Sequence, residues 1–168
     1  MIRNEYRDRW AGWLPQALQA LAKDPPDYAS VMPHMPTPAP AAMPFSRVSG
    51  DLRVVIVSSS GAYNTRSQAP FAASAIVGDP THRVIDADIP AQHLAFAHEH
   101  FKHASAQSDL ECIIPRDTIR SMGVQLTPHL ISWTGFLLDW PTFIEATVPQ
   151  IVKQAQVDGA NAALLVPI

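Results

Sequence analysis

An apolar, β-branched run from Leu52 to Ser58 constrains the fold of this 168-residue sequence more than any other feature. Its centre, Val54 to Val57, has no polar member, which is typical of a strand buried on both faces. A second apolar run, Ala162 to Val166, predicts another buried strand. Strands covered on both faces occur mainly in parallel sheets with helices on each side, so we expect an α/β fold with a mainly parallel sheet.

Helical patterns alternate with these strands. The clearest helix is predicted from Thr142 to Asp158, where apolar residues recur at spacings of three and four and Pro149 causes a local distortion. Residues Asn4 to Lys23 have the same periodicity, but Pro15 interrupts it, so we expect a helix that breaks or restarts near this proline. Two shorter elements are also expected, a strand from Arg83 to Ile85 and a helix from Arg116 through Met122.

Prolines set the first part of the chain apart. Seven of the sixteen prolines lie between positions 25 and 44, and they predict an extended arm, because proline lacks an N–H donor and has a fixed φ. We therefore divide the chain into an N-terminal helix with a Pro-rich arm, residues 1–48, and an α/β domain, residues 49–168. Met32, Met35 and Met43 in this arm indicate packing on an apolar surface such as a second subunit, so a homo-oligomer or hetero-oligomer is expected.

Composition excludes several classes of protein. Hydrophobic residues make up 47% of the chain and charged residues 16%, which is typical of a globular protein and not of a disordered one. A formal net charge of -3 without a basic run argues against nucleic-acid binding, and no apolar run is long enough to span a membrane. The charged first residues do not resemble a signal peptide, so a cytoplasmic location is expected. The single cysteine, Cys112 in a predicted apolar strand, rules out a disulfide within the chain.

Three histidines within six residues, His98, His100 and His103, form the strongest chemical signal. Imidazole is the commonest metal ligand, and an extended or turned segment would let all three converge on one ion such as zinc or iron. Glu99 or His129 would complete that site, and these two residues are also our candidate catalytic groups. The alternative interpretation is that the histidines only hydrogen-bond to the backbone. Nothing in the sequence indicates a nucleotide cofactor.

Small polar residues mark a candidate substrate site at the carboxyl end of the first predicted strand, where α/β proteins place ligand loops. If a helix begins after this turn, its N–H groups and hydroxyls would hold a small carboxylate or phosphate. An arginine at the start of the next strand would suit a carboxylate. The alternative is an ordinary strand-to-helix turn beside a surface ion pair. The candidate substrate-binding residues are Ser58, Ser59, Ser60, Gly61, Tyr63, Asp79 and Arg83.

Several segments, taken in order, resemble the selenoprotein B family of glycine, sarcosine, betaine and D-proline reductases. The resemblance runs from about Pro33 onward, and the order and spacing of its motifs are more specific than any one of them. The motifs are Val54 to Tyr63, Gly78 to Ile85, His98 to His103, Ile114 to Asp117, Gly135-Phe136 and Asp158 to Pro167.

The resemblance implies a flavodoxin-like three-layer sandwich and reductive cleavage of a C–N bond in a small amine by selenocysteine or cysteine. In the family the redox residue follows the strand similar to Ala162–Pro167, and this sequence stops at Ile168 without it. Either the sequence is truncated, a partner chain supplies the thiol, or this branch carries out different chemistry. Cys112 lies far earlier and is not its equivalent. The expected function is that of a selenium-free member that cleaves a C–N or C–S bond in a small amino-acid-like or sulfur-containing substrate, with a metal held by the histidine cluster. The alternatives are a metal-dependent lyase or hydrolase, or a non-catalytic or half-site subunit whose partner supplies the redox thiol.

Overall fold

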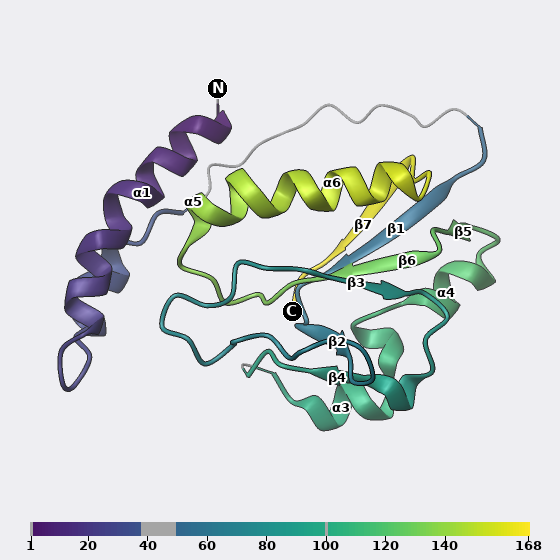
Figure 1. The fold of residues 1–168 in the computed structure, drawn as a ribbon, viewed down its shortest axis with the longest axis horizontal. Coiled ribbons are helices and arrows are strands. Elements are labelled where there is room, and N and C mark those ends of the chain that lie inside the picture. Colours follow the sequence, from purple (N-terminus) through teal and green to yellow (C-terminus); the bar gives the residue numbers. More distant parts are fainter. Residues whose placement is uncertain (1, 38–49, 100) are drawn as a thin grey trace.

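A five-stranded mixed sheet forms the centre of the computed structural model, which describes residues 2–37, 50–99 and 101–168 (Figure 1). In the middle lies β1, which is parallel to β7 on one side. On its other side β1 pairs in parallel with two strands, with β5 near its amino end and with β6 near its carboxyl end. At the far edge, β3 runs antiparallel to β6. The strands are β1 (Arg53–Ser58), β3 (Arg83–Asp86), β5 (Gln125–Leu126), β6 (His129–Ser132) and β7 (Ala162–Val166). The α/β class is therefore confirmed, with one antiparallel strand in an otherwise parallel sheet.

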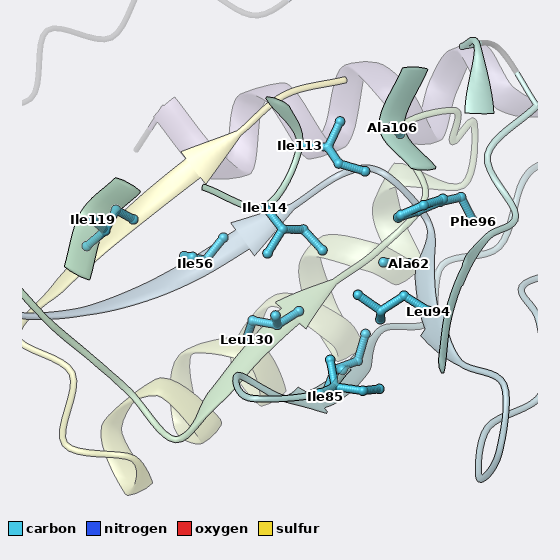
Figure 2. Close-up of a cluster of buried hydrophobic side chains, with 11 residues drawn as sticks. Ile56, Ala62, Ile85, Leu94, Phe96, Ala106, Ile113, Ile114, Ile119 and Leu130 are labelled. Carbon is cyan, nitrogen blue, oxygen red and sulfur yellow. The ribbon is translucent and has the colours of Figure 1, made fainter. Parts of the chain in front are cut away.

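Helices pack on both faces of this sheet because alternate residues of β1 point to opposite sides. On one face, Val55 and Val57 form a cluster with Ile131 and with residues of α6 (Val148–Val157). On the other face, Ile56 joins a larger cluster next to α3 (His103–Ser108) and α4 (Arg116–Ser121) (Figure 2). Figure 1 shows α6 on one side of the sheet and α3 and α4 on the other. This two-sided burial explains the unbroken apolar run in β1.

The strand β7 forms where the sequence predicts it, but its predicted burial is wrong. It pairs with β1 along its whole length and lies at the edge of the sheet. The side chain of Leu165 is 70% exposed, and Leu164 is also exposed. Burial of a strand depends on its neighbours in space, and the local sequence does not specify them.

The N-terminal helix α1 (Ile2–Leu21) continues through Pro15, so the predicted break is wrong. Pro15 removes one backbone hydrogen bond, but apolar packing on both sides of it holds the helix together. Trp10 and Trp13 are buried in a cluster with Leu138, and Trp10 lies 6.0 Å from the ring of Trp140. Figure 1 shows α1 beside α5 (Trp140–Thr142) at one end of the molecule.

The prediction of an extended Pro-rich arm is wrong for its first part. Two short helices, α2 (Tyr28–Val31) and the 3-10 helix η1 (Met32–His34), follow α1. They form because the side chain of Asp27 accepts a hydrogen bond from the N–H of Ser30, and because a proline is tolerated in a first helical turn. Residues 38–49, with Met43 and the proposed domain boundary, lie outside the described residues.

The predicted helix from Thr142 to Asp158 is confirmed, with a change of geometry near Pro149. The π-helix η4 (Phe143–Thr147) precedes α6, so the backbone hydrogen-bond pattern shifts just before this proline. The predicted helix α4 is also confirmed.

Cys112 does not lie in a strand. It ends the 3-10 helix η3 (Leu110–Cys112) and is exposed.

The remaining elements are β2 (Ala62–Asn64), which pairs antiparallel with β4 (Leu94–Phe96), and the 3-10 helix η2 (Ala91–His93). No helix in the described ranges is both long enough and apolar enough to cross a membrane.

Candidate functional site

Buried hydroxyl groups gather at the carboxyl ends of β1 and β6. Ser58 and Ser132 pair in the register of the two strands, and Ser60 forms an isolated bridge with Thr134. All four side chains are at most 1% exposed. Burial of hydroxyls costs free energy unless they are hydrogen-bonded, and here the Ser58 Oγ donates to the Ser60 Oγ at 3.0 Å. We call residues 58–61 the serine turn, and it is a polar region buried at the sheet edge that α/β proteins use for ligands.

The backbone of this turn has no helix N-terminus to hold an anion. The strand β2 follows the turn, so the helix on which that interpretation depended is absent there, and the role of these residues in substrate binding stays a prediction. Its N–H groups donate to internal acceptors: Ser59 to the carbonyl of Val166, Gly61 to the carbonyl of Trp133, and Ala62 to the Oγ of Ser132. These bonds fix the turn and leave ligand contacts to side chains.

His98 is the residue of the histidine cluster that the structure brings to the serine turn. It is 5% exposed, and the N–H of the preceding residue, Ala97, donates to the carbonyl of Gly61 at 3.0 Å. The His98 ring lies against Gly135: a Cβ added to this glycine would be 2.8 Å from the His98 Nε2 atom. Gly135 therefore leaves the space that the imidazole occupies.

A pocket of about 490 Å³ opens next to this turn, and we call it the Ser59 pocket. Its polar side chain is Ser59, whose Oγ accepts a hydrogen bond of 2.8 Å from the N–H of Ile168. Trp133 provides an aromatic wall. The lining residues are Val57, Ser59, Trp133, Gly135, Leu165, Val166, Pro167 and Ile168.

Asp79 and Arg83 both hold backbone segments in place. The carboxylate of Asp79 accepts hydrogen bonds from the N–H groups of Ala72 and Thr81 and from the Thr81 hydroxyl. The Arg83 guanidinium donates to Thr81 and to backbone carbonyls, and it stacks on the ring of Phe71 at 4.1 Å. Their predicted role in substrate binding stays a prediction, and these contacts give both residues a structural role.

We predict that Asp79→Asn destabilises the protein by about 1–3 kcal/mol at pH 7, because the amide nitrogen cannot accept the hydrogen bonds that the carboxylate oxygens accept. Burial alone would raise the pKa of Asp79. Hydrogen bonds from Thr81 and Ala72, together with the charge of Arg83, outweigh burial and lower this pKa below its ordinary 3.8. A lowered pKa stabilises the fold above the ordinary value, and this contribution is lost as the pH falls through the folded-state pKa.

The difference in unfolding free energy between wild type and Asp79→Asn should therefore narrow below about pH 4. Urea unfolding at neutral pH and at successively lower pH values measures it. Asp88→Asn is the control, because Asp88 is exposed in its ion pair with Arg120 and its loss should cost less than about 0.5 kcal/mol. A difference for Asp79→Asn that stays constant with pH would contradict this prediction.

His129 lies away from the serine turn. It begins β6, three residues before Ser132, and its Nδ1 atom is 3.1 Å from both carboxylate oxygens of Asp158. The Asp158 side chain is 4% exposed and also accepts from Gln154. This His–Asp pair lies near the amino end of β1, since the N–H of Asn161 donates to the carbonyl of Arg53 there. The structure does not bring His129 together with the other candidate residues that it describes.

The other predicted site residues are dispersed. Glu99 lines a separate pocket of about 400 Å³ with Met32 and Phe136, and Tyr63 lies in β2. The His103 Nε2 atom is 2.6 Å from the carbonyl oxygen of His98. In the parts of the chain that the structure describes, no three His, Cys, Asp or Glu side chains are grouped to hold a metal ion. His100 lies outside the described residues, so the three-histidine metal site stays a prediction.

Sequence reasoning missed Ser132, Thr134 and Gly135 as members of the site. A signal for them exists: these small and hydroxyl residues follow the apolar pair Leu130-Ile131, as the serine turn follows Val54–Val57. The contact between His129 and Asp158 has no such signal, because the two residues are far apart in the sequence.

Comparison with known proteins finds a relative. The chain is 27% identical over 134 residues to D-proline reductase subunit gamma of Acetoanaerobium sticklandii. The match covers 77% of this chain and 54% of the relative, so this chain spans about half of the relative's length. The predicted resemblance to the selenoprotein B family is thereby confirmed. No family model matches the chain. No solved structure matches it.

Proposed function

We propose that this chain is a selenium-free member of a reductase family that includes D-proline reductase, and that it binds a small amino-acid-like or sulfur-containing substrate in the Ser59 pocket. The observation that carries the proposal is the position of this pocket. It lies where β1 and β7 end, and its lining includes Ser59 and Gly135, against which the His98 ring lies. The similarity to D-proline reductase subunit gamma supports a reduction as the reaction, and we assign this reduction to the cleavage of a C–N or C–S bond. A flavodoxin-like three-layer arrangement is part of the same proposal.

The electron balance of this reaction bears on how the subunit works. Reductive cleavage of a C–N bond consumes two electrons and two protons, which two thiols supply when they become a disulfide. Cys112 is exposed on η3, and its neighbour Ile113 belongs to the cluster on the α4 side of the sheet. Residues of both clusters line the Ser59 pocket: Val57 is from the α6 side, and Val166 and Ile168 pack against the α4 side. Cys112 is not among the lining residues, which favours the half-site form of the proposal, in which a thiol outside this sequence, such as one on another polypeptide, supplies the electrons.

Side chains of this chain would then bind and orient the substrate. The Ser59 hydroxyl provides a hydrogen-bonding group, and Trp133 provides an apolar surface for the carbon skeleton. His98 supports the wall of the pocket behind Gly135. The N–H groups of the serine turn already donate hydrogen bonds within the chain. These bonds keep this wall of the pocket rigid, which lowers the entropic cost of ligand binding.

Binding to a panel of small amines tests this function. We expect D-proline, glycine, sarcosine or betaine to bind with a Kd below about 1 mM by isothermal calorimetry. Ser59→Leu fills the pocket and should abolish binding, whereas Ser67→Leu, at an exposed position, should leave it unchanged. Binding without product formation when dithiothreitol is the only reductant supports the half-site form. Equal binding by the two variants, or no binding of any ligand in the panel, would contradict the proposal.

The metal site is a second part of the proposal, and it rests on the closeness of His98, His100 and His103 in the sequence. His103 would bind a metal through Nδ1, because its Nε2 atom already contacts the His98 carbonyl. Replacement of His98 and His103 by alanine should reduce zinc or iron content to background, since one remaining imidazole holds a divalent ion weakly. Elemental analysis after metal reconstitution measures this content. A full equivalent of metal in the double variant, or none in the wild type, would contradict the metal site and leave the pocket proposal standing.

A further inference from the structure

Two tryptophans at the ends of one loop of the candidate site pack against each other. Trp133, the aromatic wall of the Ser59 pocket, follows β6, and Trp140 begins α5. Their ring centroids lie 5.8 Å apart with the planes inclined at 69°, the edge-to-face arrangement that aromatic rings favour. Residues 134–139 between them include Gly135, against which the His98 ring lies. The contact between the two tryptophans therefore closes the loop that shapes the site.

The middle of this loop is not surrounded by continuous packing. Gly135 lines the Ser59 pocket and also a second pocket of about 520 Å³, which is lined in part by α1. A hydrogen bond holds the preceding residue, because the Thr134 hydroxyl donates to the carbonyl of Asp79. Such bonds fix backbone positions, and they leave the orientation of the Trp133 ring to its apolar contacts.

Trp133 is half-buried, and several contacts set the orientation of its ring. It packs against the apolar cluster on the α6 side of the sheet. Two aromatic rings also contact it, those of Trp140 and of Phe143, the latter at 4.6 Å. Phe143 in turn contacts Trp140 at 5.5 Å, with the planes at 89°. The three rings form one unit, so removal of Trp140 would take a neighbour from each of the other two.

The N-terminal helix holds Trp140 from the other side. The Trp140 ring lies 6.0 Å from that of Trp10 and 6.4 Å from that of Tyr6. Trp10 is 3% exposed, and its indole N–H has no acceptor among the described residues. By contrast, Trp13, further along α1, donates its indole N–H to the carbonyl of Val31. Packing and not a hydrogen bond therefore sets the orientation of Trp10, and its contact with Trp140 connects α1 to the site.

We propose that Trp140 is a positioning residue for the Ser59 pocket, and that it holds the Trp133 ring in the orientation that lines this pocket. A ligand binds more tightly to a wall that is already ordered, because immobilising a mobile side chain on binding costs free energy. Through Trp140, α1 contributes to a site that lies in residues 49–168. The inference rests on the proposed function only for the identity of the ligand, since the ring contacts are its evidence.

The mobility of the Trp133 indole tests this role without any ligand. Its N–H order parameter, from nitrogen-15 relaxation, should match that of rigid backbone in the wild type, about 0.85. Trp140→Leu keeps apolar bulk but removes the ring, so the order parameter should fall to about 0.6 or below. Trp140→Phe restores a ring and should restore the order parameter. Because Trp140 is half-buried, we expect both variants to fold, and circular dichroism checks this.

Ile119→Ala is the matched control for lost stability. Ile119 is buried in the cluster on the α4 side of the sheet, so its truncation should destabilise the fold without loosening Trp133. Calorimetric titration with D-proline, glycine, sarcosine and betaine gives the second readout. Trp140→Leu should weaken the binding measured for the wild type about two- to tenfold, whereas Trp140→Phe and Ile119→Ala should leave the Kd within about twofold.

Three results would overturn the proposal. One is a Trp133 indole that is already mobile in the wild type, a measurement that needs no variant. Another is an indole that stays ordered in folded Trp140→Leu. The third is an equal loss of affinity in Ile119→Ala, because general destabilisation would then explain the loss. If no ligand of the panel binds the wild type, the proposed function fails, and the order parameters alone support or overturn the role of Trp140.

Discussion

Alanine in place of Gly78 should lower the free energy of unfolding by about 3 kcal/mol or more. Gly78 has a φ of +75° and forms a bridge with Leu137. A Cβ at this position would overlap the backbone carbonyl oxygen of Phe136, which cannot move as a flexible side chain can. This contact joins the 78–82 turn to the segment that carries Gly135, so the loss should also loosen the candidate site.

Gly123→Ala is the matched control for this prediction. Gly123 has a φ of +76°, but no atom lies within 4 Å of the Cβ that would be added. Its substitution should therefore cost only the conformational penalty, about 1–2 kcal/mol. Urea unfolding of both variants separates the two effects. Equal destabilisation would show that the close approach of Gly78 to Phe136 contributes nothing.

The second large effect is expected at Gly135. Its alanine variant should weaken ligand binding at least tenfold, about 1.4 kcal/mol. The backbone of Gly135 does not require a glycine conformation, but the new Cβ would lie 2.8 Å from His98 Nε2 and 3.1 Å from the carbonyl oxygen of Ile168. The imidazole must shift, and the wall of the Ser59 pocket shifts with it.

Gly12→Ala controls for this experiment. Gly12 lies in α1 with no atom within 4 Å of an added Cβ, so ligand affinity should not change. Calorimetric titration of both variants with the ligand found for the wild type makes the comparison. If Gly135→Ala binds as tightly as Gly12→Ala, the packing of His98 against Gly135 does not shape the site.

The sequence predicts the fold well where a pattern is local. The run Val54–Val57 predicts β1 and its burial, because a strand covered on both faces needs apolar side chains on both. The same argument fails for the burial of β7, because its neighbours and not its sequence decide its exposure. It also fails for α1, in which aromatic packing outweighs the effect of Pro15. Strands as short as β2 and β4 have no periodicity to detect.

The candidate site is predictable only in part, for the same reason. The serine turn was found because ligand loops follow the carboxyl ends of parallel strands. The position of His98 behind Gly135 depends on how the loop after β4 folds back, which no local pattern gives. Likewise, the hydrogen bonds that occupy Asp79 and Arg83 come from loop residues such as Ala72 and Pro70.

Mapping a bound ligand by nuclear magnetic resonance tests the central claim most directly. The wild-type chain would be titrated with the tightest ligand of the amine panel while backbone amide and tryptophan indole signals are recorded. Binding in the Ser59 pocket predicts saturable shifts at Ser59, Gly135 and the Trp133 indole, with His129 and Gln154 unchanged. Shifts confined to His129 and Gln154, or no saturable shift at the serine turn, would contradict the assignment of this pocket as the substrate site.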